Sequence, residues 1–221
     1  MTYFQFLVKY YPLVFLWISA ITVVAVYRNS WPLSYKILAI FILFYTLSDT
    51  IGGIMASFYK MNNHFIYNFL YSVQFLVISH FYYHRLNSRL LKKAIIISVF
   101  TYLLLDIISA IWLYRADTLH TYNYVLGGFV VVILSLAYLL QIYARAESNN
   151  IFHDPVFWFS LAWLLFFSLT VPFLGMINYL NTNYPVLALD YYVLVVDITD
   201  CLRSILLSIG FLHTKSAKRL C

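Results

Sequence analysis

Charged residues are scarce in this sequence. Of its 221 residues, only 10% are Asp, Glu, Lys or Arg, while 63% are hydrophobic and 20% are aromatic. A soluble domain usually carries about 25% charged residues, because its surface must face water. This shortage excludes an ordinary soluble fold, and the composition instead predicts an all-α integral membrane protein without a soluble appendage.

Cysteine and the common catalytic motifs are also scarce or missing. Cys201 lies inside an apolar run and Cys221 is far from it in the expected threading, so no disulfide framework is predicted. The sequence lacks a glycine-rich phosphate loop, a serine nucleophile elbow and a cysteine–histidine arrangement. An enzyme is therefore the least favoured class, and no cofactor is expected.

Long apolar runs are what the sequence has instead. Seven of them are long enough to cross a bilayer core about 30 Å thick as helices, and polar turn segments separate them. They predict one transmembrane domain over residues 1–221, a polytopic seven-helix bundle. The first run lacks a preceding basic region and a following small-residue cleavage site, so we expect it to be retained. The runs are Leu7–Tyr27, Ile37–Tyr59, Phe65–Tyr83, Ala94–Tyr114, Tyr122–Tyr143, Val156–Leu180 and Leu187–Leu212.

Basic residues lie mostly in the gaps between these runs. The formal net charge is +6, but the charges follow alternate gaps rather than one soluble face, so nucleic acid is not an expected partner. Positive residues near helix ends are retained in the cytoplasm. The bias predicts an outside N-terminus and a cytoplasmic C-terminus. The richer side holds Arg28, Lys36, Arg85, Arg89, Lys92, Lys93, Arg145, Lys215, Lys218 and Arg219, and the other side holds Lys9, Lys60 and Arg115.

Polar residues inside the apolar runs are the candidate site residues. At a rise of 1.5 Å per residue, Asp49, Gln74, Asp106 and Asp197 all lie about 16–20 Å from the cytoplasmic boundary. Helices of opposite direction thus place polar groups in one mid-membrane layer. A charged side chain there costs at least about 2.5 kcal/mol, so it is by default a functional-site candidate.

The seventh run carries a polar stripe. Asp197, Asp200 and Arg203 recur every three residues, which puts them on one face of a helix, and Asp200 can form an i,i+3 ion pair with Arg203. We expect this face to point into the bundle, where the layer forms a hydrated pocket for a ligand or a proton. A structural alternative stays open, in which Asp200 and Arg203 are a staple between helices. In that alternative, Asp49 and Asp106 bind neighbouring hydroxyl groups.

Smaller patterns concern helix packing and helix ends. Aromatic residues near the ends of the runs, Tyr191 and Tyr192 among them, are typical of an interfacial belt. The adjacent glycines Gly127 and Gly128 predict a close helix–helix approach. Asp154 before a proline is typical of an N-cap that opens a helix. Ser48, Gly52 and Ala56 form a second ridge of small residues, in the second run.

Histidine spacing suggests a metal site only superficially. His80 and His84 have the i,i+4 spacing of paired metal ligands. No second acidic or histidine pair occurs at a matching depth, and His84 adjoins a cluster of basic residues. We therefore expect no metal.

Two segments carry a resemblance to known membrane proteins. NNHFIYNFLYSVQF (residues 62–75) and DPVFWFSLAWLLFF (residues 154–167) resemble patterns in uncharacterised bacterial seven-helix membrane proteins and in the membrane input modules of sensor histidine kinases. The resemblance implies a sensor-like role and a bacterial inner-membrane location. A retinal protein is excluded, because no lysine occurs between Lys93 and Lys215, and the DRY and NPxxY receptor signatures are missing.

Two functions follow as hypotheses. In the first, a sensor or receptor-like module in the lipid bilayer binds a small ligand or a proton at the acidic layer and signals through a separate partner. In the second, the chain is a small transporter or channel with Asp197 or Asp200 as a protonatable group. We favour the first, because runs one to three show no repeat in runs five to seven of the kind that many transporters contain.

Overall fold

All regular elements in the described part of the chain are helical. The computed structural model describes residues 3–113, 118–144 and 151–215. Segments Leu33–Phe58, Arg89–Trp112, Thr121–Tyr143 and Pro155–Gly175 are each long and apolar enough to cross a membrane. These findings confirm the all-α class and indicate a membrane-embedded protein. The elements are α1 (Tyr3–Val26), α2 (Leu33–Phe58), α3 (His64–Arg85), α4 (Arg89–Ile108), η1 (Ser109–Leu113), α5 (Thr121–Tyr143), η2 (Ile151–His153), α6 (Pro155–Gly175), α7 (Ile177–Asn183), α8 (Pro185–Tyr191), η3 (Tyr192–Asp197) and α9 (Ile198–His213).

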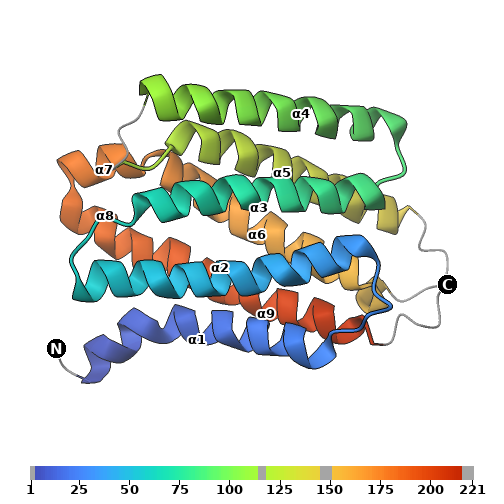
Figure 1. Ribbon diagram of the computed structural model, residues 1–221, viewed down its shortest axis with the longest axis horizontal. Coiled ribbons are helices and arrows are strands. Elements are labelled where there is room, and N and C mark those ends of the chain that lie inside the picture. The colour runs from blue at the N-terminus through green and yellow to red at the C-terminus, as the bar shows by residue number, and fades with distance from the viewer. Residues whose placement is uncertain (1–2, 114–117, 145–150, 216–221) are drawn as a thin grey trace.

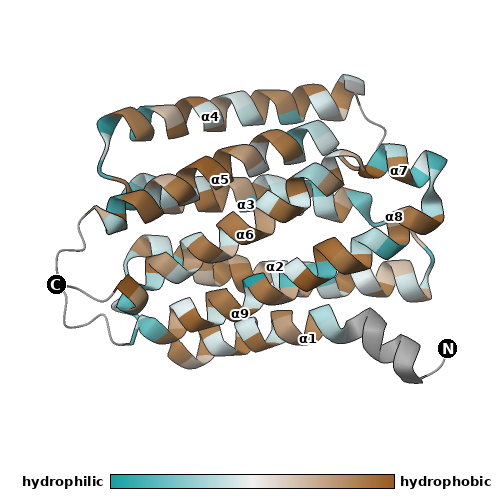
Figure 2. Cartoon of the chain, turned by 180° about the vertical axis from the view of Figure 1, so that it is seen from behind, coloured by the Kyte–Doolittle hydropathy of each residue, from teal (hydrophilic) through white to brown (hydrophobic). Residues whose placement is uncertain are grey.

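The long helices run side by side as a bundle (Figure 1). The principal packing partners follow a closed circuit, in which α1 contacts α2, α2 contacts α3, α3 contacts α5, α5 contacts α6, α6 contacts α9 and α9 returns to α1. Helix α4 packs on α3 and α5 from outside this circuit. Hydrophobic residues dominate along the helices, and hydrophilic residues gather near the helix ends and on α7 (Figure 2).

Helix α6 begins where the sequence predicts. The carboxylate of Asp154 accepts a hydrogen bond from the backbone N–H of Val156 at 2.8 Å, and Pro155 occupies the first turn. This is an N-cap, which satisfies a backbone donor that the helix cannot bond internally. The predicted cap is confirmed.

The same helix ends earlier than expected. The sixth apolar run was expected to form one helix up to Leu180, but α6 stops at Gly175, and the chain turns at Met176 into the short helix α7. Pro172 lies one turn before this end and lacks a backbone N–H donor, which weakens the helix locally. The break places α7 and α8 at one end of the bundle (Figure 1).

Two π-helical segments interrupt the α-helical geometry. Segment η1 begins three residues after Asp106, and segment η3 ends at Asp197. π-helical turns are rare and frequently occur at functional sites. Segments α8, η3 and α9 nevertheless run without a gap from Pro185 to His213.

Glycines allow the closest helix approaches, as Gly127 and Gly128 predicted. A Cβ atom on Gly128 would lie 2.3 Å from Val171 Cγ2 on α6, and one on Gly127 would lie 2.8 Å from Tyr102 Cε2 on α4. Gly210 on α9 is equally tight, since its Cβ would lie 2.4 Å from Phe159 Cε1 and 3.1 Å from the Pro155 carbonyl oxygen. Real Cβ atoms do not approach other atoms at 2.3 to 2.8 Å, so these helices contact each other through glycine.

Gly210→Ala should therefore lower the stability by about 1–3 kcal/mol, the usual cost of overpacking a dense core. The measurement is thermal unfolding of the purified protein in detergent. Gly53→Ala on α2 is the matched control, because its Cβ would meet nothing within 4 Å. The control should leave stability unchanged or raise it, since alanine favours the helix. Equal melting temperatures for the two variants would contradict the close packing of α6 and α9.

Candidate ligand-binding site

A buried ion pair lies at the centre of the site. Asp200 and Arg203, one turn apart on α9, pair through Asp200 Oδ1 and Arg203 Nη2, and both residues are buried. The predicted i,i+3 pair is confirmed. Because both partners belong to α9, the pair does not itself join two helices.

The guanidinium of Arg203 is also enclosed by aromatic rings. Its Cζ atom lies 4.6 Å from the ring centroid of Tyr45 on α2 and 4.2 Å from that of Phe166 on α6. A cation over an aromatic face is attracted by the ring quadrupole, and more strongly when it is removed from water. These contacts hold Arg203 between three helices.

Two further carboxylates face this pair. Asp49 on α2 lies close enough to Asp200 and Arg203 for their charges to interact. Asp197 lies within the same range of Asp200 and Asp49. Both Asp49 and Asp197 are only partly buried. Three carboxylates thus converge with one guanidinium, and the group as a whole favours positive charge.

Tyrosines surround the carboxylates, and the sequence interpretation missed them. Tyr67 donates a hydrogen bond from its hydroxyl to Asp49 Oδ1 at 3.1 Å, and Tyr71 lies one turn farther along α3. Tyr192 was expected in the interfacial belt, but it packs on the ring of Phe173, with centroids 6.3 Å apart, in electrostatic range of Asp197 and Asp49. We call the whole group the acid–tyrosine cluster. Its members are Asp49, Asp197, Asp200, Arg203, Tyr45, Tyr67, Tyr71 and Tyr192.

A repeated spacing in the sequence could have revealed these tyrosines. Tyr45 lies four residues before Asp49, and Tyr67 lies four residues before Tyr71. Residues four apart share a helix face. Each pair therefore marks the face of α2 or α3 that points toward α9.

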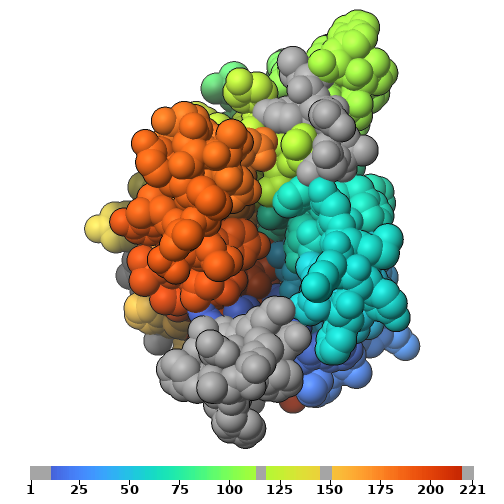
Figure 3. All heavy atoms as spheres, turned by 90° about the vertical axis from the view of Figure 1, so that its left-hand side faces the viewer, coloured from blue at the N-terminus to red at the C-terminus, as the bar shows by residue number. Residues whose placement is uncertain are grey.

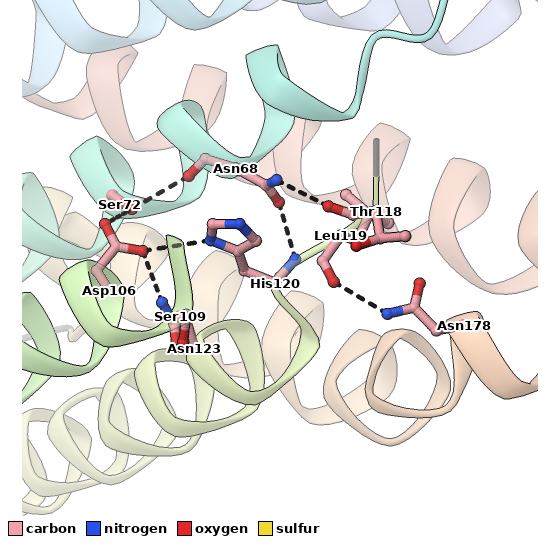
Figure 4. Close-up of polar contacts among 9 residues, drawn as sticks. All are labelled: Asn68, Ser72, Asp106, Ser109, Thr118, Leu119, His120, Asn123 and Asn178. Carbon is pink, nitrogen blue, oxygen red and sulfur yellow. Dashed lines mark hydrogen bonds and ion pairs between the residues drawn. The ribbon is translucent and has the colours of Figure 1, made fainter. Parts of the chain in front are cut away.

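Asp106 does not join the acid–tyrosine cluster (Figure 4). Its Oδ2 atom accepts a hydrogen bond from Ser72 Oγ at 2.7 Å, and its Oδ1 atom accepts one from Asn123 Nδ2 at 2.6 Å. His120 Nδ1 lies 3.7 Å from the same Oδ1 atom. Ser72 is five residues from Tyr67, which corresponds to about 140° around α3. The two acids are therefore bonded on different sides of that helix.

The surroundings of Asp106 anchor a loop. Asn68 on α3 donates from Nδ2 to the Thr118 carbonyl oxygen at 3.0 Å and accepts from the His120 backbone N–H at 2.9 Å (Figure 4). Asn178 on α7 donates to the Leu119 carbonyl oxygen at 3.0 Å. These bonds fix the segment before α5 to α3 and α7, which is a structural role.

Gln74 shares a small cavity with Arg203. It is buried on α3 and lines a cavity of about 20 Å³ together with Arg203, Ser19 and Ser204. The predicted site residues therefore divide into two places. Gln74 lies beside the acid–tyrosine cluster, and Asp106 lies apart from it.

A dense aromatic layer closes the bundle beyond the cavity. We call it the aromatic plug, and its rings are buried with neighbouring centroids 4.8 to 6.3 Å apart. Arg85 covers its far side, with Cζ 4.5 Å from the Tyr35 ring centroid. The plug consists of Trp31, Tyr35, Phe81, Phe159, Trp163 and Phe211.

The opposite end of the bundle is hollowed. Figure 3 looks onto the end that carries α7 and α8 and shows a hollow between these helices and the segment where α2 passes into α3. Asp49 and Asp197 lie on the side of Arg203 that faces this end, because α2 leads toward α3 and η3 leads back toward α8. The hollow and the aromatic plug thus lie toward opposite ends of the bundle.

The histidine pair considered as a metal site lies elsewhere. The rings of His80 and His84 contact each other on α3, with centroids 4.7 Å apart. Among residues 3–113, 118–144 and 151–215, no group of three or more His, Cys, Asp or Glu side chains is arranged to hold a metal ion. Cys201 is buried on α9, and Cys221 lies outside the described residues.

Comparison with known proteins identifies no relative. No family model matches the chain, and neither a curated protein nor a solved structure does. The function is therefore argued from the site itself.

Arg203→Gln should lower stability by about 3–5 kcal/mol, because it leaves the Asp200 carboxylate buried without its ion-pair partner. The double variant Asp200→Asn with Arg203→Gln removes both charges and should recover much of that loss. Thermal unfolding in detergent measures both variants beside the parent. Losses of equal size in the single and the double variant would argue against the pair.

Proposed function

We propose that this protein is a receptor-like membrane module that binds a small cationic ligand or a proton at the acid–tyrosine cluster. The observation that carries the proposal is a group of three interacting carboxylates with a single guanidinium: Asp49 and Asp200 lie in electrostatic range of Arg203, and Asp197 lies in range of both acids. Asp200 balances the charge of Arg203. The two remaining carboxylates are partly exposed and lack a basic partner in the cluster, so a positive ligand or proton would complete it.

The two ends of the site favour binding over conduction. Asp49 and Asp197 are partly exposed, and a hollow lies between α7–α8 and the segment where α2 passes into α3 at the end of the bundle toward which they lie (Figure 3). On the other side, the six rings of the aromatic plug are buried and pack on one another. A channel or a transport path would have to cross this layer, whereas a ligand that enters and leaves by the same side would not.

The rings around the cluster suit an organic cation. Tyr67, Tyr71 and Tyr192 present aromatic surface next to carboxylates, and aromatic faces attract ammonium groups. A protonated amine would gain both interactions at once. An inorganic ion would use the carboxylates alone.

The proposal includes seven membrane spans. Helix α3 is less apolar than the other long helices, but its polar side chains have partners within the protein. Asn68 and Ser72 donate hydrogen bonds to Thr118 and Asp106, and Gln74 lines the cavity beside Arg203. Its 22 residues correspond to about 33 Å, enough to cross a bilayer core. The continuous segment from Pro185 to His213 is also long enough. Together with α1 and the four apolar helices, these two segments would make seven.

Orientation and partner complete the proposal. With the α7–α8 end outside, the loops between α1 and α2 and between α3 and α4 lie in the cytoplasm with Arg28, Arg89, Lys92 and Lys93. A separate signalling protein would bind these basic loops. The resemblance to sensor input modules supports a bacterial inner membrane as the location. Arg115, Arg145, Lys218 and Arg219, which also enter the charge bias, lie outside the described residues.

Single cysteines test the orientation. In a background with Cys201→Ala and Cys221→Ser, Asn183→Cys should react with a membrane-impermeant thiol reagent in intact cells. Ser88→Cys should react only after permeabilisation. Both positions are exposed, so a missing reaction reports sidedness rather than burial. The reverse pattern would overturn the orientation and the proposed route of access.

Ligand binding tests the site. A panel of small protonated amines should contain compounds that raise the melting temperature of the parent protein. At a ligand concentration 100-fold above Kd, binding adds about 2.7 kcal/mol to the free energy of unfolding. Size-matched carboxylic acids should have no effect. Asp49→Asn and Asp197→Asn should abolish the amine effect and still fold, because each substitution removes one of several like charges.

Asp106→Asn is the matched control, since Asp106 has its own hydrogen-bond partners outside the cluster. It should retain the amine effect. If the carboxylates stabilise the protein instead, or if Asp106→Asn abolishes binding as fully as Asp49→Asn, the proposed site is wrong. Amine uptake into liposomes that contain the purified protein, lost in Asp197→Asn, would support a transporter instead.

A further inference from the structure

The cavity beside Arg203 has a polar lining that remains unsatisfied. Four of the residues that line it each have a buried side-chain atom without a hydrogen-bond partner among the described residues: Ser19 Oγ, Gln74 Oε1, Arg203 Nε and Ser204 Oγ. Their residues are 1%, 2%, 4% and 1% exposed. A buried polar group without a partner loses its hydrogen bonds to water and gains none in return, and native proteins keep few such groups.

These atoms come from three different helices. Ser19 lies on α1, Gln74 on α3, and Arg203 and Ser204 on α9. The rest of the wall is largely apolar, with Leu38, Leu207 and Trp163 among its side chains. Four orphaned groups in one small space indicate a common partner rather than four separate defects.

We propose that the cavity binds one structural water molecule, which bridges Arg203 to Ser19, Gln74 and Ser204. The cavity volume is about 20 Å³, and a single water needs about 10–15 Å³ measured in the same way. Dry cavities in proteins are lined by apolar side chains, whereas buried waters make about three hydrogen bonds to polar ones.

The pattern of donors and acceptors fits water better than an ion. Arg203 Nε–H is a donor, Gln74 Oε1 is an acceptor, and the two serine hydroxyls can be either. Water can accept from Arg203 and donate to Gln74 at once, whereas chloride could not satisfy the amide oxygen. Asp200 already balances the charge of Arg203. The water would accept a hydrogen bond from Arg203 Nε, whereas Arg203 Nη2 pairs with Asp200.

Substitution of the cavity serines should change the melting temperature in opposite directions for a cavity with a bound water and for an empty one. In a dry cavity, Ser19→Ala and Ser204→Ala would each remove an unsatisfied hydroxyl and raise the melting temperature. With a bound water, each variant loses a hydrogen bond and should lower the melting temperature by about 2–4 °C. Ser19→Val, which fills the cavity and expels the water, should lower it further.

Ser79→Ala is the matched control. Ser79 on α3 is also a buried serine with an unsatisfied hydroxyl, but it does not line this cavity. Its substitution should leave the melting temperature unchanged or raise it. If Ser19→Ala and Ser204→Ala behave like Ser79→Ala, or if Ser19→Val is stabilising, the water site is overturned.

Two further measurements distinguish a bound water from a bound anion. A high-resolution crystal structure should show a water oxygen about 2.7–3.2 Å from Arg203 Nε and Gln74 Oε1. Replacement of chloride by gluconate should leave the melting temperature of the parent unchanged, and a chloride dependence that Ser204→Ala removes would identify an anion instead. No amine ligand is needed, so the result is independent of the proposed ligand site.

Discussion

The burial of Arg203 is the constraint on which the arrangement of the bundle depends. A guanidinium removed from water is costly unless its charge and its hydrogen-bond donors have partners. Here a carboxylate one turn away on α9 balances the charge, and the rings of Tyr45 on α2 and Phe166 on α6 each contact the guanidinium. Helices α2, α6 and α9 must therefore meet at one level, and the polar groups of the site gather around that meeting point.

The layering along the bundle axis follows from this centre. Toward the end that carries α7 and α8, which is hollowed (Figure 3), the carboxylates Asp49 and Asp197 are partly exposed. Away from that end, aromatic rings pack in mutual contact up to Arg85. The polar groups of the site and the aromatic layer thus lie at different levels along the bundle.

The sequence was sufficient to predict features that depend only on the spacing of residues along one helix. The i,i+3 pair on α9, the N-cap at Asp154 and the close approach at Gly128 follow from local rules, and the structure confirms them. Depth in the membrane was not enough to group the acids, because Asp49 and Asp106 are bonded on different sides of α3. That direction depends on tertiary packing, as do the role of Tyr192 and the end of α6 at Gly175.

The contact between α1 and α9 has a consequence for biosynthesis. Helix α9 packs on α1 and α6, both of which are synthesised before it, so the circuit of helices cannot close until α9 has been made. Contacts between segments so distant in the chain are slow to form. Until then, the sides of α1 and α6 that α9 covers have no partner from this segment. Docking of α9 against α1 and α6 is therefore the last step that the chain order allows in assembly of the circuit.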